Sequence, residues 1–426
     1  MRSEKLGKTS RRGFLRGMLA TGAAFQFVPR HVLGGPGYTS PNEMLTKAVI
    51  GVGGMGMAHL RLGGTKLLAV CDVDERHLKR AVEAGGKDVK GYRDFREVLA
   101  RPDIDVVHIP TPPHWHALIS IAAAEAGKDI WCEKPMSRTI GEGKQVVAAV
   151  RRNGRMFRIN TWFRLRAGFY GMGIPVKPIK KAVQTRLLGW PLKVTIGVHQ
   201  GFPLKLSTWS GLPDLKPEPV PAHLDYDMWL GPAPYKPYSR HRTHCTFRGY
   251  WDYDGGGLGD MGQHYLDPVQ YLLEKDNTSP VEIEVDTPLQ HPDAVKPWKC
   301  VRMKYADGCE IILDGDDSLK DASFIEGPAG SISQGLQSNI PELSKKLQEL
   351  PDPEPQQADF TDSVRRRKAF GIDEGIAHRS CTLVNLALIG VRLGRSLRYD
   401  PVAERFIEDD AANQLIDQPV RAPWRI

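Results

Sequence analysis

Two residues able to do acid–base chemistry, Asp260 and His264, stand four positions apart just after the run Gly255-Gly256-Gly257. On a helix, residues four apart share one face, so the carboxylate can fix the imidazole tautomer and stabilise its protonated form. Such a pair can act as a general base that removes the proton of an alcohol. The simpler alternative is a helix-capping Asp beside an ordinary, partly buried His. Three consecutive glycines allow a ligand to approach the backbone closely, which favours the catalytic interpretation.

A lysine is the third chemical group. Lys134 lies in Glu133-Lys134-Pro135 after the apolar run 130–132, and the segment from Thr111 to His116 follows the run 106–109. Open parallel sheets bind ligands at the carboxyl ends of their strands, so both segments should border one crevice. Considered alone, Lys134 could equally be a solvated surface charge, and the prolines of both segments could be turn formers.

A glycine fingerprint, Gly51-Val52-Gly53-Gly54-Met55-Gly56, follows the apolar run Ala48 to Ile50. Its first glycine allows a tight turn, the second the approach of a pyrophosphate, and the third the packing of helix on strand. Asp72 ends the next apolar run, where a carboxylate binds the adenosine ribose and repels the 2′-phosphate of NADP. The pattern therefore predicts an NAD site, with NADP disfavoured. The alternative is a glycine-rich turn beside a surface Asp.

The elements that must position these groups alternate along the first third of the chain. The predicted strands are 48–51, 67–71, 106–109, 130–132 and 157–159, and the predicted helices between them are 55–61, 75–84, 95–100, 116–126 and 140–152. Alternating strands and amphipathic helices indicate βαβ units with right-handed crossovers. We therefore expect an α/β fold whose N-terminal NAD-binding Rossmann domain, a doubly wound parallel sheet, spans residues 47–160.

The second half has consecutive strands. They are predicted at 192–198, 281–286, 300–305, 309–313 and 322–326, with helices near 180–188, from Asp260 onward and at 376–393. This order predicts a C-terminal α+β domain with an open, largely antiparallel sheet, at 161–395, for substrate binding and oligomerisation. A loop-like tail, 396–426, should pack on the body. The loop 201–248 is long enough that we expect it to line a binding site.

Most of the net charge of +8 lies in residues 1–31, which carry seven basic residues and one acidic residue. The rest of the chain is nearly balanced, which argues against nucleic-acid binding. The basic segment around Arg11 and Arg12 precedes a mainly small or apolar stretch, an order typical of a twin-arginine export signal. We predict the signal at 1–33 and a linker at 34–46; the alternatives are a disordered basic arm and a signal retained as an anchor.

Other features exclude several classes of protein. Apolar residues make up 41% and charged residues 25%, as in globular proteins, and no apolar run is long enough to span a bilayer. The six cysteines lack zinc-site spacing, so we expect no metal site and six reduced thiols. Cys300 and Cys309 flank a predicted hairpin turn in a register that suits a disulfide poorly.

Together these motifs resemble the Gfo/Idh/MocA family of oxidoreductases, which includes glucose-fructose oxidoreductase and inositol dehydrogenase. The likeness runs from about Lys47 to Ile426 and is strengthened by the segments 225–232 and 421–424, which resemble a secreted bacterial branch with twin-arginine signals. The resemblance implies a Rossmann domain followed by an α/β domain whose open sheet commonly forms the dimer interface. We accordingly expect a homodimer or homotetramer.

The resemblance also implies roles for individual residues. Lys134 and His264 would contact the reacting hydroxyl, Asp260 would support them, and the Lys134–Pro135 bond is often cis in the family. Cofactor contacts are implied for Gly51, Gly53, Gly54, Met55, Gly56, Asp72, Thr111, Pro112, His114, His116, Glu133 and Lys134. Substrate contacts are implied for Lys134, Asn160, Arg164, Asp260 and His264. The stretch Asn160 to Arg166 matches the family's substrate-binding pattern only loosely.

The sequence thus predicts an exported, NAD-dependent oxidoreductase that acts on a hydroxyl-bearing carbon of a sugar, polyol or glycoside. Export would place it in the periplasm or cell envelope, where free NAD is not expected, so the enzyme should retain its cofactor. One alternative is an NAD-dependent glycosidase with a closed cycle of oxidation, elimination and reduction. A second alternative is a non-catalytic sensor of sugar or NAD.

Overall fold

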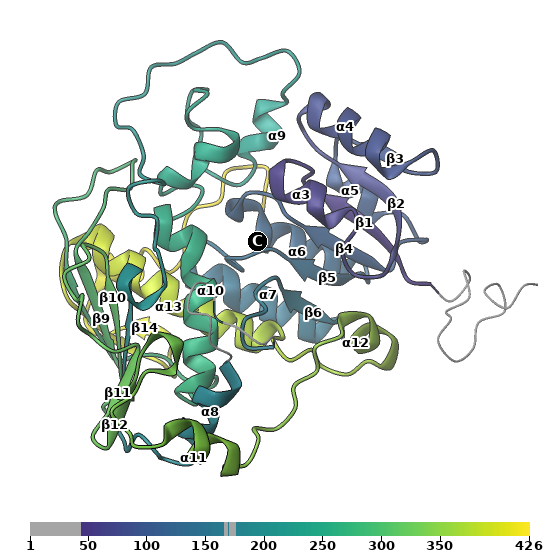
Figure 1. The fold of residues 1–426 in the computed structure, drawn as a ribbon. Helices are drawn as coiled ribbons and strands as arrows, with labels where there is room; N and C mark the ends of the chain where they lie inside the picture. Colours follow the sequence, from purple (N-terminus) through teal and green to yellow (C-terminus); the bar gives the residue numbers. More distant parts are fainter. Residues whose placement is uncertain (1–43, 166–168, 170–175) are drawn as a thin grey trace, which may run out of the picture. The chain divides into compact units, whose positions relative to one another are not determined.

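The computed structural model describes residues 44–165, 169 and 176–426, and its first sheet has six parallel strands in the order β3-β2-β1-β4-β5-β6 (Figure 1). The strands are β1 (Thr46–Ile50), β2 (Lys66–Cys71), β3 (Lys90–Tyr92), β4 (Val106–Ile109), β5 (Asp129–Cys132) and β6 (Phe157–Ile159). This is the doubly wound order, so the predicted fold class is confirmed. The prediction missed β3 because this short edge strand is mostly exposed and lacks an apolar run. The predicted export signal lies outside the described residues.

Helices connect these strands, and local capping fixes where several of them begin. They are α3 (Gly54–His59), α4 (Glu75–Gly85), α5 (Phe95–Leu99), η1 (Pro113–Trp115), α6 (His116–Glu125) and α7 (Ile140–Arg152). The Asp74 side chain caps α4, and Thr139 and Glu142 form a reciprocal capping box at the start of α7. These caps set the helix starts close to the positions predicted from the apolar pattern.

The second sheet has eight strands in the order β12-β11-β7-β10-β9-β8-β13-β14. They are β7 (Lys193–Ile196), β8 (Glu282–Asp286), β9 (Cys300–Lys304), β10 (Glu310–Asp314), β11 (Ile325–Gly327), β12 (Gly330–Ile332), β13 (Leu397–Asp400) and β14 (Arg405–Phe406). Only the β7–β10 pair is parallel, as expected for a largely antiparallel sheet. Cys300 pairs with Asp314 rather than with Cys309, and all six cysteines are free. Part of the tail predicted as loop forms β13 and β14, because its alternating buried residues complete the sheet.

Two long helices, α10 (Gly256–Leu272) and α13 (Glu374–Leu393), pack against each other. In Figure 1, α13 lies between the two sheets, and it contacts both α7 and β8. Helix α10 begins at Gly256, four residues before the predicted start at Asp260. Gly257 lies so close to the Leu204 carbonyl oxygen, 2.1 Å from where a Cβ would be, that only glycine fits there despite its low helix propensity. The remaining helices are α8 (Val176–Gln184), η2 (Val198–Gln200), α9 (Tyr226–Leu230), η3 (His244–Gly249), η4 (Gln334–Leu336), α11 (Leu343–Glu349), α12 (Phe360–Arg366) and α14 (Asp410–Asn413).

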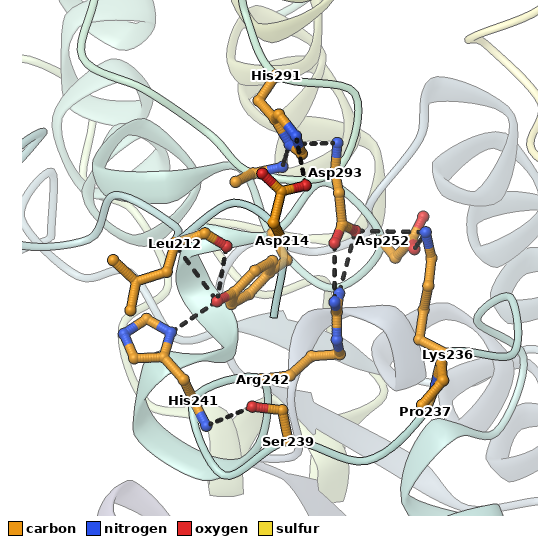
Figure 2. A network of polar contacts seen from close by, with 12 residues as sticks. Leu212, Asp214, Lys236, Pro237, Ser239, His241, Arg242, Asp252, His291 and Asp293 are labelled. Atoms are coloured by element: carbon orange, nitrogen blue, oxygen red, sulfur yellow. Dashed lines mark hydrogen bonds and ion pairs between the residues drawn. The ribbon is translucent and has the colours of Figure 1, made fainter. Parts of the chain in front are cut away.

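The long segment between β7 and α10 is fixed by a network of polar contacts (Figure 2). The Arg242 guanidinium donates two hydrogen bonds to the Asp293 carboxylate, at 3.0 and 2.8 Å. The Lys236 ammonium lies 3.4 Å from the same carboxylate, and the His241 ring lies 2.6 Å from the Tyr250 hydroxyl. Paired charges of this kind hold in one conformation a loop that contains only short helices.

Within the described residues, no helix is both long and apolar enough to cross a membrane. The end of the chain packs on the first domain: the Trp424 ring lies edge-on to Trp115, with centroids 4.8 Å apart. Arg421 donates to the Asp227 carboxylate and to the Gly231 carbonyl. The predicted boundaries at residues 160 and 395 stay predictions.

Candidate active site

The glycine turn has the geometry that a dinucleotide requires. Gly51 has φ +91°, and a Cβ there would lie 2.9 Å from the Thr111 side chain. At Gly56 a Cβ would lie 2.0 Å from the Gly51 carbonyl oxygen, so only glycine fits both places. A Cβ at Gly53 would meet only the edge of the His77 ring at 3.7 Å, and one at Gly54 would meet nothing within 4 Å. The turn therefore leaves space where a pyrophosphate can approach the backbone.

Asp72 stands beside this turn at the end of β2. One of its carboxylate oxygens accepts a hydrogen bond from the Val52 amide at 2.8 Å, and the other accepts one from the Asp74 amide at 2.9 Å. Each oxygen keeps a lone pair for a further donor. The residues present thus fit NAD: an open glycine turn for the pyrophosphate and an oriented carboxylate for the ribose hydroxyls.

The segments that follow β4 and β5 are joined by the buried imidazole of His116. Its two ring nitrogens lie 2.8 Å from the Thr111 carbonyl oxygen and 2.6 Å from the Pro135 carbonyl oxygen. His114 is also buried and contacts the Trp229 carbonyl oxygen at 3.0 Å. Both rings contact backbone carbonyl oxygens, so in this structure they hold the segments that follow β4 and β5 in place.

Glu133 holds the start of the segment that carries Lys134. Its carboxylate lies 2.8 Å from the His59 ring and accepts a hydrogen bond from the Asn160 amide. Burial alone would raise the pKa of Glu133, but the contacts with His59 and the charge of Lys134 lower it to about 2. Asn160 also accepts a hydrogen bond from the Trp131 indole. Asn160 therefore supports the segment that carries Lys134.

Lys134 and Asp260 meet across the two domains. The Lys134 ammonium donates to the Asp260 carboxylate at 2.9 Å and to its main-chain carbonyl at 2.6 Å, and the Lys134–Pro135 bond is cis. The Arg248 guanidinium lies 3.0 Å from the same carboxylate oxygen. Burial alone would raise the pKa of Asp260, but the two cations lower it below its ordinary value. The carboxylate is thus ionised and holds Lys134 in one position.

His264 occupies the next turn of α10. Its ring packs edge-on against Trp162 and Phe163, with centroids 5.4 and 5.3 Å away. Within the described part of the chain, its buried Nδ1 has no hydrogen-bond partner, and no hydrogen bond joins it to Asp260. Burial and the charge of Lys134 lower the pKa of His264 to about 3. The imidazole is therefore neutral, with a polar atom free for a ligand.

Two predicted relations differ from the structure. The four-residue spacing suggested that Asp260 holds His264, but Lys134 and Arg248 occupy its carboxylate instead. Arg164 is not brought into this group, because its fully buried guanidinium is paired with Asp267 and Asp276. A buried arginine is stable only with such partners.

Two further residues lie in or beside the site and were not predicted. Arg248 comes from the end of the long loop, and its only sequence signal is a position shortly before the glycine run. Asp254 directly precedes Gly255, whose amide donates to its carboxylate at 2.8 Å. Burial and the negative charge of Asp260 raise the pKa of Asp254 to about 7. Asp254 is therefore a readily protonated carboxyl group whose side chain lines a separate cavity with Trp251 and Asn385.

A Rossmann domain with a pyrophosphate turn is followed by a mixed-sheet domain that brings Asp260 and His264 to the crevice beside Lys134, an arrangement that fits the two-domain class of dinucleotide-dependent oxidoreductases. The chain belongs to the Gfo/Idh/MocA oxidoreductase family. Residues 45–161 match the family's NAD-binding Rossmann fold, and residues 172–426 match its C-terminal alpha/beta domain. The predicted family and its cofactor, NAD, are thereby confirmed.

Similar proteins have related but distinct activities. Inositol 2-dehydrogenase of Salmonella typhimurium is 29% identical over 156 residues, which cover 35% of this chain and 44% of that protein. A glycosyl hydrolase family 109 protein of Shewanella baltica is 37% identical over 122 residues, 26% of this chain and 27% of that protein. The matched segments thus span less than half the length of these relatives. The fold resembles that of the WlbA dehydrogenase of Chromobacterium violaceum, solved with NADH and UDP-GlcNAcA (TM-score 0.58, 20% identity, 84% of this chain and 96% of that one).

Proposed function

We propose that this protein oxidises a secondary alcohol of a sugar, polyol or glycoside with NAD as the electron acceptor. The observation that carries the proposal is the cross-domain contact of Lys134 with Asp260, beside the neutral ring of His264. Relatives named for inositol oxidation support a hydroxyl-rich substrate. NAD is favoured over NADP because Asp72 would repel a 2′-phosphate.

Each group of the site has a distinct task in this proposal. The Lys134 ammonium binds the substrate hydroxyl and stabilises the negative charge that develops on its oxygen. The unpartnered nitrogen of His264 accepts the hydroxyl proton, which it can do because the ring is neutral. Asp260 and Arg248 hold Lys134 in position. Bound NAD supplies the acceptor for the hydride that leaves the substrate carbon.

The test is a substrate screen followed through nicotinamide absorbance. Wild-type protein loaded with NAD is mixed with inositols, aldoses, uronates and alkyl glycosides, and the Lys134→Met variant is the matched control. Reduction of NAD by wild-type protein alone supports the proposal. Tight sugar binding without any reduction of nicotinamide would instead indicate a sensor.

A second candidate, a glycosidase with a closed redox cycle, is favoured by one observation: Asp254 is a buried carboxyl with a pKa of about 7. A protonated carboxyl can donate its proton to a departing glycosidic oxygen. The similarity to a family 109 glycosyl hydrolase points the same way. This candidate predicts release of the aglycone without net NADH, faster below pH 7 than above it. In Asp254→Asn that pH dependence should vanish; net NADH from every substrate would exclude a closed cycle.

Export and assembly complete the proposal. We propose that residues 1–33 direct export by the twin-arginine route, with NAD already bound, and that the open second sheet joins two subunits. Fractionation of cells that express the wild type or Arg11→Lys/Arg12→Lys tests the first point, since only the wild type should leave the cytoplasm.

Retention of the cofactor has its own test. Mass spectrometry of protein purified without added cofactor should find nicotinamide in most chains.

A further inference from the structure

A second cluster of titratable side chains surrounds the start of α4, away from Lys134. Asp74 is fully buried there, and its carboxylate oxygen lies 3.3 Å from the His244 ring and 3.6 Å from the His223 ring. The ligand atoms of Asp74, His77 and His244 all lie within 4.8 Å of one another. The rings of His77 and His244 face each other edge-on, with centroids 4.9 Å apart. Imidazoles thus gather around one carboxylate.

The fold brings these residues together from two distant segments. Asp74 and His77 are three residues apart on the first turn of α4, whereas His223 and His244 belong to the long loop. Backbone hydrogen bonds seat this loop on the end of β2, from the Glu75 amide to the His223 carbonyl at 2.9 Å and from the Asp225 amide to the Val73 carbonyl at 3.0 Å. The cluster is therefore built on fixed backbone.

The neighbouring polar network orients the segment that carries His244. Arg242, two residues before it, is locked to Asp293 by two hydrogen bonds, as Figure 2 shows. Asp74 is held in turn, because one of its oxygens accepts a hydrogen bond from the Arg76 amide at 2.9 Å. The other oxygen faces His244 and His223 and also lies 3.4 Å from the Arg76 guanidinium, which is exposed and would turn toward solvent when an ion binds. Ligand atoms that other contacts already hold in place, as here in Asp74 and His244, favour the binding of an ion.

We propose that Asp74, His77 and His244 bind a divalent transition-metal ion, with zinc as the best fit and His223 as the fourth ligand. Ligands about 2.0–2.1 Å from a tetrahedral ion lie roughly 3.3 Å apart. Asp74 lies 3.3 Å from His244 and 3.6 Å from His223, whereas the ligand atom of His77 lies within 4.8 Å of those of Asp74 and His244, so the His77 and His223 rings would move closer when the ion binds. Imidazole ligands favour zinc and related ions, whereas magnesium and calcium require mainly oxygen ligands.

The ion would have a structural task. Four protein ligands leave no open position for a reacting group, as in structural zinc sites. The ion would join α4 of the Rossmann domain to the long loop beside Asp72, whose carboxylate lies 3.7 Å from the His77 ring. It would thus fasten the loop at the adenosine end of the NAD site. The three imidazoles are partly exposed, so an ion can enter from solvent.

The test uses the untagged full chain, stripped with a chelator and titrated with Co²⁺, whose visible absorption reports tetrahedral coordination. We expect one Co²⁺ per chain, displaced by Zn²⁺, and a loss of affinity of more than about 100-fold in His77→Ala and in His244→Ala. His199→Ala, at an exposed histidine outside the cluster, should bind as the wild type does. Unchanged affinity in both cluster variants, or no saturable binding by the wild type, would overturn the proposal.

A second measurement separates loss of the ion from loss of the fold. Zn²⁺ should slow proteolysis of the loop 201–253 in the wild type but not in His244→Ala. If His77→Ala does not fold, Asp74→Asn replaces it, because Asn keeps a side-chain oxygen that caps α4 while removing the anionic ligand. Equal protection by Zn²⁺ in wild type and variants would place the ion elsewhere and contradict the proposal.

Discussion

The two ends of the NAD crevice are built in different ways. At the adenosine end, Gly51, Gly56 and Asp72 lie within one segment of strand, turn, helix and strand, and Gly56 and Asp72 are fixed by backbone atoms of that same segment. At the chemical end, Lys134 comes from the Rossmann domain, whereas Arg248 and Asp260 come from the second domain, so the three residues meet only when both domains have packed. Local backbone geometry therefore specifies the first end, and tertiary packing specifies the second.

The largest expected effect is at the chemical end. Lys134→Met should lower the rate of nicotinamide reduction by about 10³- to 10⁴-fold, because the developing oxyanion loses its charged partner. NAD affinity should fall far less than this rate, since the pyrophosphate turn is untouched and only the contact expected of Lys134 with the cofactor is lost. Single-turnover absorbance and NAD binding by fluorescence measure the two quantities separately. A matching loss of NAD affinity would show that the two ends are not independent.

His264→Ala should have a smaller effect on the same rate. We expect a loss of about 10²- to 10³-fold, because the buried neutral ring accepts the proton while Lys134 still stabilises the oxyanion. His264→Gln, whose amide accepts a hydrogen bond but is not a base, should be about as slow as His264→Ala. A wild-type rate of nicotinamide reduction in His264→Ala would show that another group accepts the proton.

At the adenosine end, two neighbouring glycines should respond differently to the same substitution. Gly56→Ala should lower the free energy of unfolding by about 1–3 kcal/mol, because the new Cβ would overlap the Gly51 carbonyl. Gly54→Ala is the matched control and should change it by less than about 0.5 kcal/mol, since a Cβ there has open space. Chemical denaturation measures both, and equal losses would refute this description of the turn.

A change of about the same size in free energy concerns cofactor choice. Asp72→Ser should shift the ratio of NAD to NADP affinity toward NADP by about 10- to 100-fold, the equivalent of one lost charged hydrogen bond. The exposed Asp88→Ser should leave the ratio unchanged. An unchanged ratio in Asp72→Ser would remove this carboxylate from the ribose site.

The same contrast explains what the sequence could predict. The glycine turn and Asp72 were predictable because each follows an apolar strand at a fixed spacing. The spacing of Asp260 and His264 placed both on α10. It could not show that Lys134, 126 residues earlier in the chain, would donate a hydrogen bond to the Asp260 carboxylate. The helix start at Gly256 was missed because a run of glycines has low helix propensity.

Charge pairing across long separations accounts for the other omissions. Arg164 lay in the stretch expected to contact substrate, yet Asp267 and Asp276, more than 100 residues later, enclose its guanidinium. The histidine cluster was equally hidden, because its members combine a helix start near residue 74 with loop residues near 223 and 244, which no local spacing relates.

The central claim is that Lys134 and Asp260 act as one unit built across the domains. A double-mutant cycle on the single-turnover rate of nicotinamide reduction, with Lys134→Met, Asp260→Asn and the double variant, tests it most directly. If Asp260 works by holding Lys134, the double variant should be about as slow as Lys134→Met alone, with a coupling of roughly 1–3 kcal/mol. Rate losses that simply multiply would show that the two residues act independently and would contradict this account.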